Sequence, residues 1–429
     1  MKIVYIVPGT GGTFYCQNCM RDIELVRELR RQGHEVLMVP VYLPVLVDSD
    51  ELSKGVPVFF GGINCYLQQK FALFRKTPRW LDKLFDTAWL LKGAAKKEGT
   101  TEAAGLGPMT LSMLQGPEGN QKKELDRMIA WLADQERPDV VHLSNALLLG
   151  MAGAIKSRLN VPLLCSLQDE KPWLDAIDDP YNRLCWEAMG QRAGDIDAFV
   201  AVSRWYADEM MARVELPPEK VHIIHLGIQC DDVPQAPMTL EPPVIGYLSK
   251  MTESLGLGTL VDAFIELKQH PRLKKLKLRA TGGQVGADVT YVKYLKRKLH
   301  KHGFDEDAEF LDEFDVEHRR AFIQSLSAMC VPNAEGEAFG LFIIEALAAG
   351  VPVVQPRAGA YPEIVEAAGG GVLYEGGAHA LAAALEGLLL DADRARALGH
   401  QGREGVARSF STRRMAADMI ALYSKVTQG

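Results

Sequence analysis

The sequence has no long hydrophobic run and no excess of positive charge. Its first apolar stretch ends after a few residues at Pro8, which predicts a first strand and is too short for a signal peptide or a membrane span. The net charge of −7 excludes a protein that holds nucleic acid on a generally basic surface. With 47% hydrophobic and 24% charged residues, the composition is typical of a soluble globular protein, which we expect in the cytoplasm.

Cysteine is scarce, and its number is odd. Seven cysteines in a chain without a secretory signal indicate a reducing compartment with mostly free thiols. Cys16 and Cys19 are spaced as Cys-x-x-Cys, but no second such pair or histidine pair completes a four-ligand zinc site. A redox pair would need a lowered thiol pKa, which a sequence does not show. We interpret the two as ordinary loop residues and leave their role open.

The chain is too long for one hydrophobic core, so 429 residues predict two domains of roughly 200 each. Both halves open with a strand, a glycine-containing turn and a helix, which together begin a Rossmann-like α/β domain. A segment with four prolines predicts the linker. The expected division is an N-terminal domain 1–233 with an irregular insertion 43–122, a linker 234–243, a C-terminal domain 244–411 and a terminal helix 412–429.

Polar residues follow several predicted strands of the first half. In open α/β sheets, the carboxyl ends of the strands build the binding site. This rule gives as candidates His142, Asn145, Gln168, Asp169, Glu170 and Ser203. His142 could supply an imidazole for proton transfer, and a histidine of the core is an equal alternative.

The most informative stretch runs from Glu337 to Glu345. A short buried strand is expected before it, Gly340 turns the chain, and apolar residues recur at helical spacing until Gly350 and Pro352 end the helix. Glu337 is therefore expected at the carboxyl end of a strand and Glu345 one to two turns into a helix. The free N–H groups at the helix start favour an anion. Spacing alone also fits two solvated charges beside a turn.

The full pattern, Glu-x-Phe-Gly-x4-Glu-Ala-x2-Ala-Gly-x-Pro-Val from Glu337, resembles the Glu-x7-Glu signature of the family-4 retaining glycosyltransferases. The resemblance covers nearly the whole chain, is strong from Val331 to Glu366 and is weak over 43–122. It implies the GT-B fold, in which two Rossmann-like domains face each other across a central cleft. It also implies a nucleotide-sugar co-substrate, no further cofactor and no metal ion, and the chain has no Asp-x-Asp placed to hold magnesium.

The resemblance assigns roles to individual residues. Glu337 would bind sugar hydroxyls and help to position the anomeric carbon, and Glu345 would bind the nucleotide ribose. The implied donor-binding residues are Gly11, Gly12, Gly246, Lys250, Ala338, Phe339, Gly340, Leu341, Glu345 and Glu363. The candidate catalytic residues are Glu337, His142 and Gln168. For Gly11 and Gly12 a tight turn without a ligand is the alternative, since the loop lacks the spacing of a dinucleotide site.

The chain departs from the family pattern at three positions. Gln168 stands where relatives usually have histidine, and glutamine cannot take a proton near neutral pH. Tyr247 and Leu255 replace the Arg/Lys pair that grips the diphosphate in the family. A cation there normally stabilises the leaving group, so we expect Lys250 to substitute for it, assisted by the helix start at Gly340 and by Arg21 or Arg357.

These observations predict a retaining glycosyltransferase that acts on a small-molecule, glycan or lipid-linked acceptor. The excess of cations among aromatic residues in 68–97 could contact an anionic acceptor or the inner face of the membrane, although packed helices with outward lysines explain it as well. The missing Arg/Lys pair keeps open a protein with an unusual donor, or one that binds sugar or nucleotide without turnover. A nucleotide-sugar epimerase, with His142 and Asp169 or Glu170 as acid and base, is a further alternative.

Overall fold

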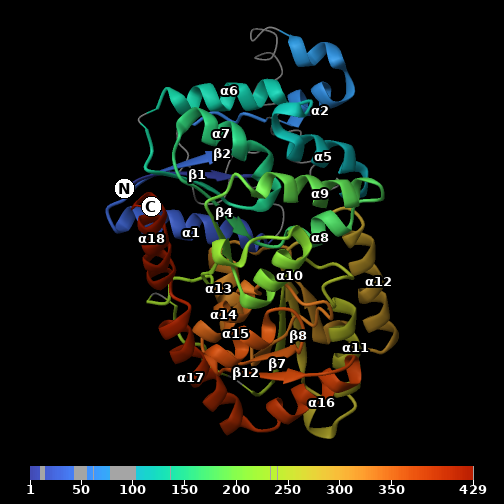
Figure 1. The fold of residues 1–429 in the computed structure, drawn as a ribbon. Helices are drawn as coiled ribbons and strands as arrows, with labels where there is room; N and C mark the ends of the chain where they lie inside the picture. The colour runs from blue at the N-terminus through green and yellow to red at the C-terminus, as the bar shows by residue number, and fades with distance from the viewer. Residues whose placement is uncertain are drawn as a thin grey trace. The chain divides into compact units, whose positions relative to one another are not determined.

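The computed structural model contains two compact units (Figure 1). Unit 1 comprises Met1–Gly12, Asn18–His225 and Ala416–Gly429, and unit 2 comprises Thr13–Gln17 and Leu226–Met415. The structure describes residues 1–9, 15–42, 56–60, 62–77, 103–135, 137–231, 233–238 and 240–428.

Unit 1 is built on a six-stranded parallel sheet in the order β2-β1-β3-β4-β5-β6. The strands are β1 Lys2–Val7, β2 Glu35–Pro40, β3 Val140–Leu143, β4 Leu163–Leu167, β5 Ala198–Ala201 and β6 Val221–Ile223. Every residue of β3, β4 and β5 is buried, which is why these segments are apolar almost throughout rather than alternating.

The helices of unit 1 connect these strands. They are α1 Gln17–Arg31, α2 Gly62–Lys70, α5 Gly107–Gln115, α6 Lys122–Ala133, α7 Ala152–Leu159, α8 Glu170–Asp175, α9 Tyr181–Ala193 and α10 Arg204–Val214. The first residue of α1, Gln17, groups with unit 2. Helix α1 shows why the sequence folds in this way, since Leu25, Val26 and Leu29 recur at helical spacing and are fully buried. Gly33, with φ of 85°, provides the left-handed residue after its end.

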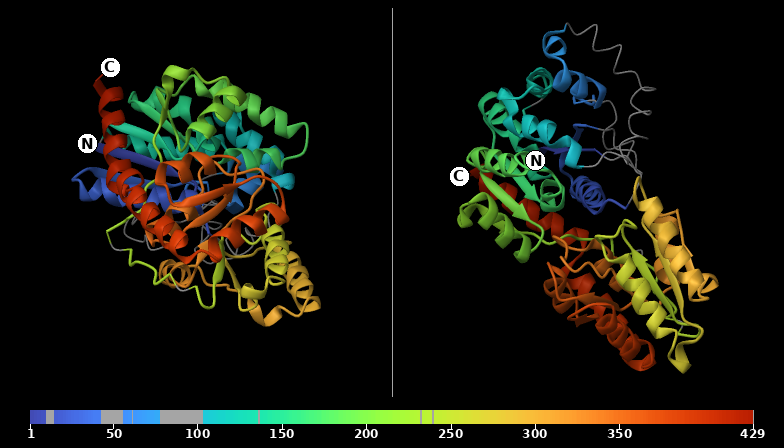
Figure 2. Two further views of the ribbon diagram at one scale, coloured as in Figure 1. Left: turned by 90° about the horizontal axis from the view of Figure 1, so that it is seen from below. Right: turned by 90° about the vertical axis from the view of Figure 1, so that its right-hand side faces the viewer.

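Unit 2 repeats the arrangement with a second six-stranded parallel sheet, in the order β12-β11-β10-β7-β8-β9. Its strands are β7 Val244–Leu248, β8 Lys277–Thr281, β9 Ala308–Phe310, β10 Ala328–Met329, β11 Val353–Pro356 and β12 Gly371–Tyr374. Its helices are α11 Leu257–Leu267, α12 Asp288–Lys301, α13 Val316–Gln324, α14 Leu341–Ala348, α15 Tyr361–Ala368, α16 Ala378–Leu389 and α17 Ala392–Ser409. Figure 2 shows this unit from two further sides, with helices packed against its sheet. The two predicted Rossmann-like sheets are both present.

The units divide the chain differently from the predicted domains. The boundary falls between His225 and Leu226, ahead of the predicted linker 234–243. The last helix, α18 Thr412–Gln428, begins in unit 2 and groups with unit 1 from Ala416 onward.

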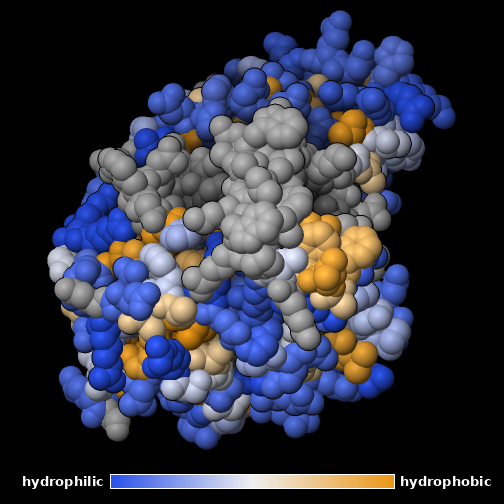
Figure 3. Space-filling view, turned by 90° about the horizontal axis from the view of Figure 1, so that it is seen from above, coloured by the Kyte–Doolittle hydropathy of each residue, from blue (hydrophilic) through white to orange (hydrophobic). Residues whose placement is uncertain are grey.

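The surface is mostly hydrophilic, with separate hydrophobic patches in the view of Figure 3. Among the described residues, the large hydrophobic side chains that are exposed are Phe71, Leu73, Ile223, Val289 and Tyr294. Within the same residues, no helix is both long and apolar enough to cross a membrane.

Candidate functional site

The segment that carries the two glutamates lies in unit 2, between β10 and α14. The chain leaves β10 at Met329, passes through an irregular loop and enters α14 at Leu341. Gly340 caps the helix with φ of 93°, and a Cβ added to it would lie 2.9 Å from Cε1 of Tyr361. Only glycine fits a backbone that is both left-handed and so closely packed. The predicted strand, turn and helix are therefore present.

Glu337 and the start of α14 are joined by one side chain, that of Gln17. The Gln17 side-chain amide donates from Nε2 to Oε2 of Glu337 at 2.7 Å. Its Oε1 accepts from the backbone N–H of Leu341 at 2.6 Å. Glu337 is 9% exposed, so its carboxylate is largely removed from water. A carboxylate acceptor and a helix N-terminal donor thus lie within reach of a single small polar group.

Glu345 lies in the second turn of α14 and is held by two neighbours. The hydroxyl of Tyr15 donates to its Oε2 at 2.6 Å, and Nε of Arg319 lies 2.9 Å from its Oε1. Arg319, on α13, also donates to the carbonyl of Phe314 at 3.1 Å, and its guanidinium lies 5.7 Å from the centre of the Tyr15 ring. The Glu345 and Arg319 side chains are only 11% and 12% exposed, so this pair is well shielded.

Burial and the neighbouring charges determine the protonation states of Tyr15 and Arg319. Burial and the charge of Glu345 raise the pKa of the Tyr15 phenol well above its ordinary value, so Tyr15 stays a hydrogen-bond donor. Burial alone would lower the pKa of Arg319, but Glu345, Tyr15 and Asp315 together outweigh it and hold that pKa above its ordinary value. Arg319 is therefore a permanent cation beside Glu345.

Tyr247 and Leu255, which replace the Arg/Lys pair of the family, lie close to this loop. Tyr247 is buried in β7 and donates from its hydroxyl to the carbonyl of Lys250 at 2.9 Å. Burial and then the charge of Glu337 raise the pKa of Tyr247, so this phenol is neutral and lies within the field of Glu337. Leu255 is half-buried just before the start of α11. Neither position supplies a charge for a phosphate.

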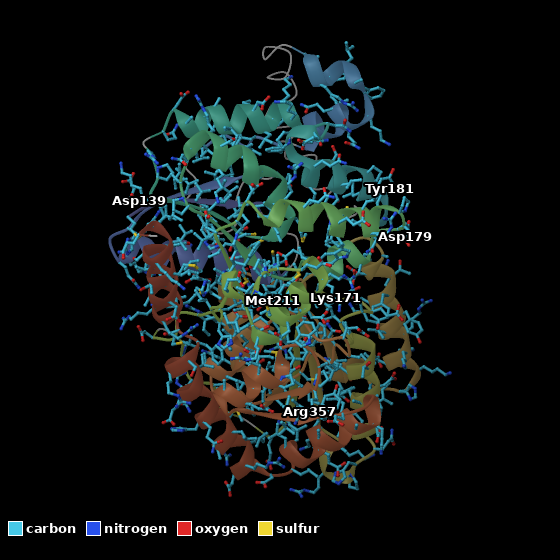
Figure 4. All side chains as sticks on the ribbon, viewed as in Figure 1. Asp139, Lys171, Asp179, Tyr181, Met211 and Arg357 are labelled. Atoms are coloured by element: carbon cyan, nitrogen blue, oxygen red, sulfur yellow. The ribbon has the colours of Figure 1, made fainter. Side chains whose placement is uncertain are left out.

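The cations proposed from the sequence to replace that charge have other partners. Nζ of Lys250 lies 3.2 Å from a carboxylate oxygen of Asp288 on α12. Arg357, labelled in Figure 4, is exposed and pairs with Glu366 at 3.3 Å and with Glu375 at 3.4 Å.

Arg21 is the most deeply buried of the proposed cations. It lies in α1 of unit 1 with 1% of its surface exposed, and its Nη2 donates to Ser166 at 2.9 Å. A cation buried in this way and held by a hydroxyl of β4 is part of the unit's interior, and the structure gives no support to its suggested role in gripping a diphosphate.

The other implied donor-binding residues divide into several groups. Ala338 and Phe339 are buried in the loop, Leu341 is buried at the start of α14, and Glu363 is half-buried in the first turn of α15. Gly246 is required by packing, because a Cβ there would lie 2.1 Å from Leu326. Gly11 and Gly12, and positions 78–97 of the cationic segment, lie outside the described residues.

His142 and Gln168 lie in the interior of unit 1. His142 is fully buried in β3, with Nδ1 2.6 Å from the Tyr423 hydroxyl and Nε2 2.8 Å from the Ser166 hydroxyl. Burial lowers the pKa of this imidazole well below its ordinary value, so it stays neutral. Gln168 is 2% exposed and donates to Asp22 at 3.3 Å. Both therefore have the environment of core residues. For His142, a core histidine was the alternative to a residue that transfers protons.

A polar cluster that the sequence did not indicate surrounds them. Asp22 accepts from the Tyr5 hydroxyl at 2.8 Å and lies beside Arg21, with 3.5 Å between its Oδ1 and Nη1 of the arginine. Burial raises the pKa of Asp22 to about 6, even though Arg21 opposes the shift. We call Tyr5, Arg21, Asp22, His142, Ser166, Gln168 and Tyr423 the unit 1 cluster.

Two sequence interpretations concern metals and thiols. Cys16 and Cys19 are disulfide-bonded, which corrects their reading as ordinary loop residues, while five other cysteines are free. In the part of the chain that the structure describes, no group of three or more His, Cys, Asp or Glu side chains is arranged to hold a metal ion.

Sequence reasoning missed Tyr15, Gln17 and Arg319. Tyr15 and Gln17 follow the first strand, which is a general position for a binding loop, but nothing local connects them with glutamates more than 300 residues away. Arg319 belongs to no recognisable sequence motif, and its contact with Glu345 depends on the packing of α13 beside α14.

Known proteins resemble both halves of the chain. The model of the glycosyl transferase 4-like domain matches residues 23–227, and that of glycosyl transferases group 1 matches 232–405. A D-inositol 3-phosphate glycosyltransferase of Corynebacterium efficiens is 31% identical over 44% of this chain and 44% of its own length. An alpha-maltose-1-phosphate synthase of Mycolicibacterium smegmatis is 26% identical over 68% of this chain and 80% of its own.

The fold is also found among solved structures. Anabaena Alr3699/HepE, crystallised in complex with UDP, matches 99% of this chain and 100% of its own with a TM-score of 0.69 and 15% identity. At that identity the likeness concerns the fold alone. It confirms the predicted GT-B fold class.

Proposed function

We propose a function for this chain, which belongs to the glycosyltransferases of the GT-B fold. In this chain a glycosyl transferase 4-like domain is followed by a glycosyl transferases group 1 domain. The protein transfers a sugar from a nucleotide-sugar donor to a hydroxyl or another nucleophile of an acceptor. The anomeric configuration is retained, and no metal ion takes part.

One observation carries this proposal, which is the convergence of Glu337 and the Leu341 N–H on a single amide. A sugar diphosphate presents a hydroxyl donor and a phosphate acceptor only a few bonds apart. Glu337 would accept from the sugar hydroxyl, and the N-terminus of α14 would bind the phosphate through its free N–H groups and its dipole. Glu345, an acceptor-only carboxylate, would bind the two ribose hydroxyls.

The transfer itself needs no dedicated base. The bond from the anomeric carbon to the leaving phosphate oxygen breaks, and the acceptor oxygen forms its bond on the same face. The proton of the acceptor passes to the leaving phosphate. The burial of His142 and Gln168 in unit 1 supports a mechanism without them, and we remove both from the catalytic set.

The charge that develops on the diphosphate must be stabilised, since this is usually a large part of the catalytic effect. With Tyr247 and Leu255 uncharged, we assign this role to the α14 N-terminus and to Lys250. Lys250 would have to bind the diphosphate in addition to Asp288, with which it forms an ion pair. Its side chain is 34% exposed, which leaves it room to do so.

The acceptor is proposed only as a class. One relative is named for an inositol phosphate and another for making a maltose phosphate, so a phosphorylated polyol or sugar is our first choice. Glycan and lipid-linked acceptors are the alternatives. The exposed side chains of Phe71 and Leu73, next to the exposed Lys70, support a contact with a membrane surface.

A binding protein without turnover is the second candidate, favoured by the uncharged Tyr247 and Leu255. Incubation with a panel of nucleotide sugars and phosphorylated acceptors separates the two. Formation of the free nucleoside diphosphate together with a glycosylated product supports transfer. Donor binding without product supports the second candidate, and donor isomerisation without an acceptor would indicate an epimerase.

A further inference from the structure

The polar groups assigned to the donor already have partners from the same unit. Three hydrogen bonds connect Tyr15 and Gln17 with Glu345, Glu337 and the N–H of Leu341, all between 2.6 and 2.7 Å. Tyr15 is 4% exposed, so the contact with Glu345 is shielded from water. In the proposed function, Glu345, Glu337 and the N–H of Leu341 bind the donor, and in the structure Tyr15 and Gln17 occupy all three.

The chemistry of the three bonds copies that of a nucleotide sugar. The Tyr15 hydroxyl donates to Glu345, as a ribose hydroxyl would. The amide oxygen of Gln17 accepts from Leu341, as a phosphate oxygen would. The amide nitrogen of Gln17 donates to Glu337, as a sugar hydroxyl would.

We propose that the segment Tyr15–Gln17 is an internal occupant of the donor site, which a donor must displace before transfer. This inference rests on the proposed function, since it takes the same groups as the donor site. It adds that the protein has a closed state, in which its own chain satisfies these groups, and an open state that binds the donor.

Two further contacts stabilise the closed state. The backbone N–H of Tyr15 donates to the carbonyl of Gly282 at 3.0 Å, and the Arg319 guanidinium lies over the Tyr15 ring. Without an occupant, Glu337, Glu345 and the N–H of Leu341 would lose these partners in a largely buried place, which is costly.

A donor can replace the occupant because its phosphate binds the α14 N-terminus more strongly than the Gln17 amide does. A phosphate oxygen is charged, whereas the oxygen of Gln17 is neutral, and charge-assisted hydrogen bonds at a helix N-terminus are the stronger kind. Arg319 keeps its bond to Oε1 of Glu345 when Tyr15 leaves. Arg319 is thus a positioning residue, which orients Glu345 in both states.

The closed state lowers the apparent affinity for the donor, because only the open fraction binds. Weakening the occupant therefore tightens binding. The experiment compares the wild type with Tyr15→Phe, Gln17→Ala and the double variant. Gln32→Ala is the matched control, since Gln32 follows the same helix and its side chain bonds to Glu28. UDP, GDP and ADP are titrated into each protein by calorimetry.

We expect Tyr15→Phe to bind its nucleotide roughly fivefold more tightly, which is the effect of one net hydrogen bond. Gln17→Ala, which loses two hydrogen bonds, should bind more tightly than Tyr15→Phe, and the double variant more tightly still. The control variant should bind like the wild type. Unchanged or weaker binding by both single variants contradicts the proposal and makes Tyr15 and Gln17 structural residues or donor ligands.

A second measurement needs no nucleotide. Hydrogen exchange of the peptide that contains the N–H of Leu341 should be faster in Gln17→Ala than in the wild type and the control. If exchange responds but no nucleotide binds to any variant, the occupant stands and the proposed donor class fails. If exchange does not change, the occupant is contradicted, whatever the nucleotides do.

Discussion

The two units carry polar groups of the same kinds in opposite situations. In the unit 1 cluster, charges and rings are bonded to one another deep inside the unit, for example Arg21 to Ser166 and His142 to Tyr423. In unit 2, Glu337 and Glu345 bond to Gln17 and Tyr15, side chains that the donor would replace in the proposed function. On the proposed function, the polar groups of the unit 1 cluster stabilise the fold, whereas Glu337 and Glu345 bind the donor. This difference predicts which substitutions affect activity and which affect stability.

The largest effect is expected for Glu337→Gln, a substitution that keeps the size of the side chain. The neutral amide no longer attracts the sugar hydroxyls in the transition state, and we expect kcat to fall by about 100- to 1,000-fold. Unfolding should change little. Steady-state kinetics with the active donor measures the fall, and Glu335→Gln, at an exposed position two residues away, is the control. Full turnover by a folded Glu337→Gln protein would remove this residue from catalysis.

In unit 1, Arg21→Ala should instead reduce stability. In the interior of the unit, it leaves Asp22 without the neighbouring cation and Ser166 without the guanidinium donor. We therefore expect a loss of about 3 kcal/mol in the free energy of unfolding. Denaturant unfolding followed by circular dichroism measures it. Arg31→Ala, on the exposed side of the same helix, is the control and should cost less than about 0.5 kcal/mol. A similar loss in both variants would place the cluster outside the structural core.

The pH dependence of stability tests the state of Asp22. Its pKa is about 6 in the folded protein against 3.8 as a free side chain, so the folded state binds the proton more tightly. Stability from this group is therefore gained as pH falls from 7 to 4.5, by about 2 kcal/mol, and is lost again as pH rises through 6.

The Asp22→Asn variant lacks this gain. The difference in free energy of unfolding, wild type minus variant, should thus increase by about 2 kcal/mol between pH 7 and pH 4.5. Asp126→Asn, at an exposed position, serves as the control. A difference that stays constant over this range would show that Asp22 titrates normally.

The smallest effect is expected for Tyr423→Phe. It removes only the hydroxyl that bonds to Nδ1 of His142, and we expect a loss of about 1 kcal/mol in the free energy of unfolding. The thermal midpoint measures it, with the exposed Tyr294→Phe as the control. An unchanged midpoint would mean that His142 does not depend on the terminal helix α18 for its place.

The fold was largely predictable from the sequence, because its signals are local. Short apolar strands, glycine turns and helical spacing indicated two parallel sheets, and the glycine at Gly340 indicated the turn into α14. The same local signals placed Glu345 correctly in the second turn of that helix. Glu337 was expected at the carboxyl end of a strand, but β10 ends at Met329 and Glu337 lies in the loop that follows.

The partners of these residues were not predictable. The position of Gln168 at the end of a strand indicates an edge of the sheet, but it does not say whether the side chain faces a cleft or the core. Lys250 follows β7 and was a reasonable cation for a phosphate, yet a carboxylate on α12 pairs with it. Gln17 meets its partners only through folding, since 320 residues separate it from Glu337.

The most direct test of the donor site is thermal unfolding of the protein with each of a panel of nucleoside diphosphates and their sugars, repeated with Glu345→Gln. Binding raises the midpoint by an amount that grows with ligand concentration over the dissociation constant. We predict a clear rise with one nucleotide, retained in Glu335→Gln and lost or greatly reduced in Glu345→Gln. No rise with any nucleotide, or an equal rise in the Glu345 variant, would contradict a donor site at α14.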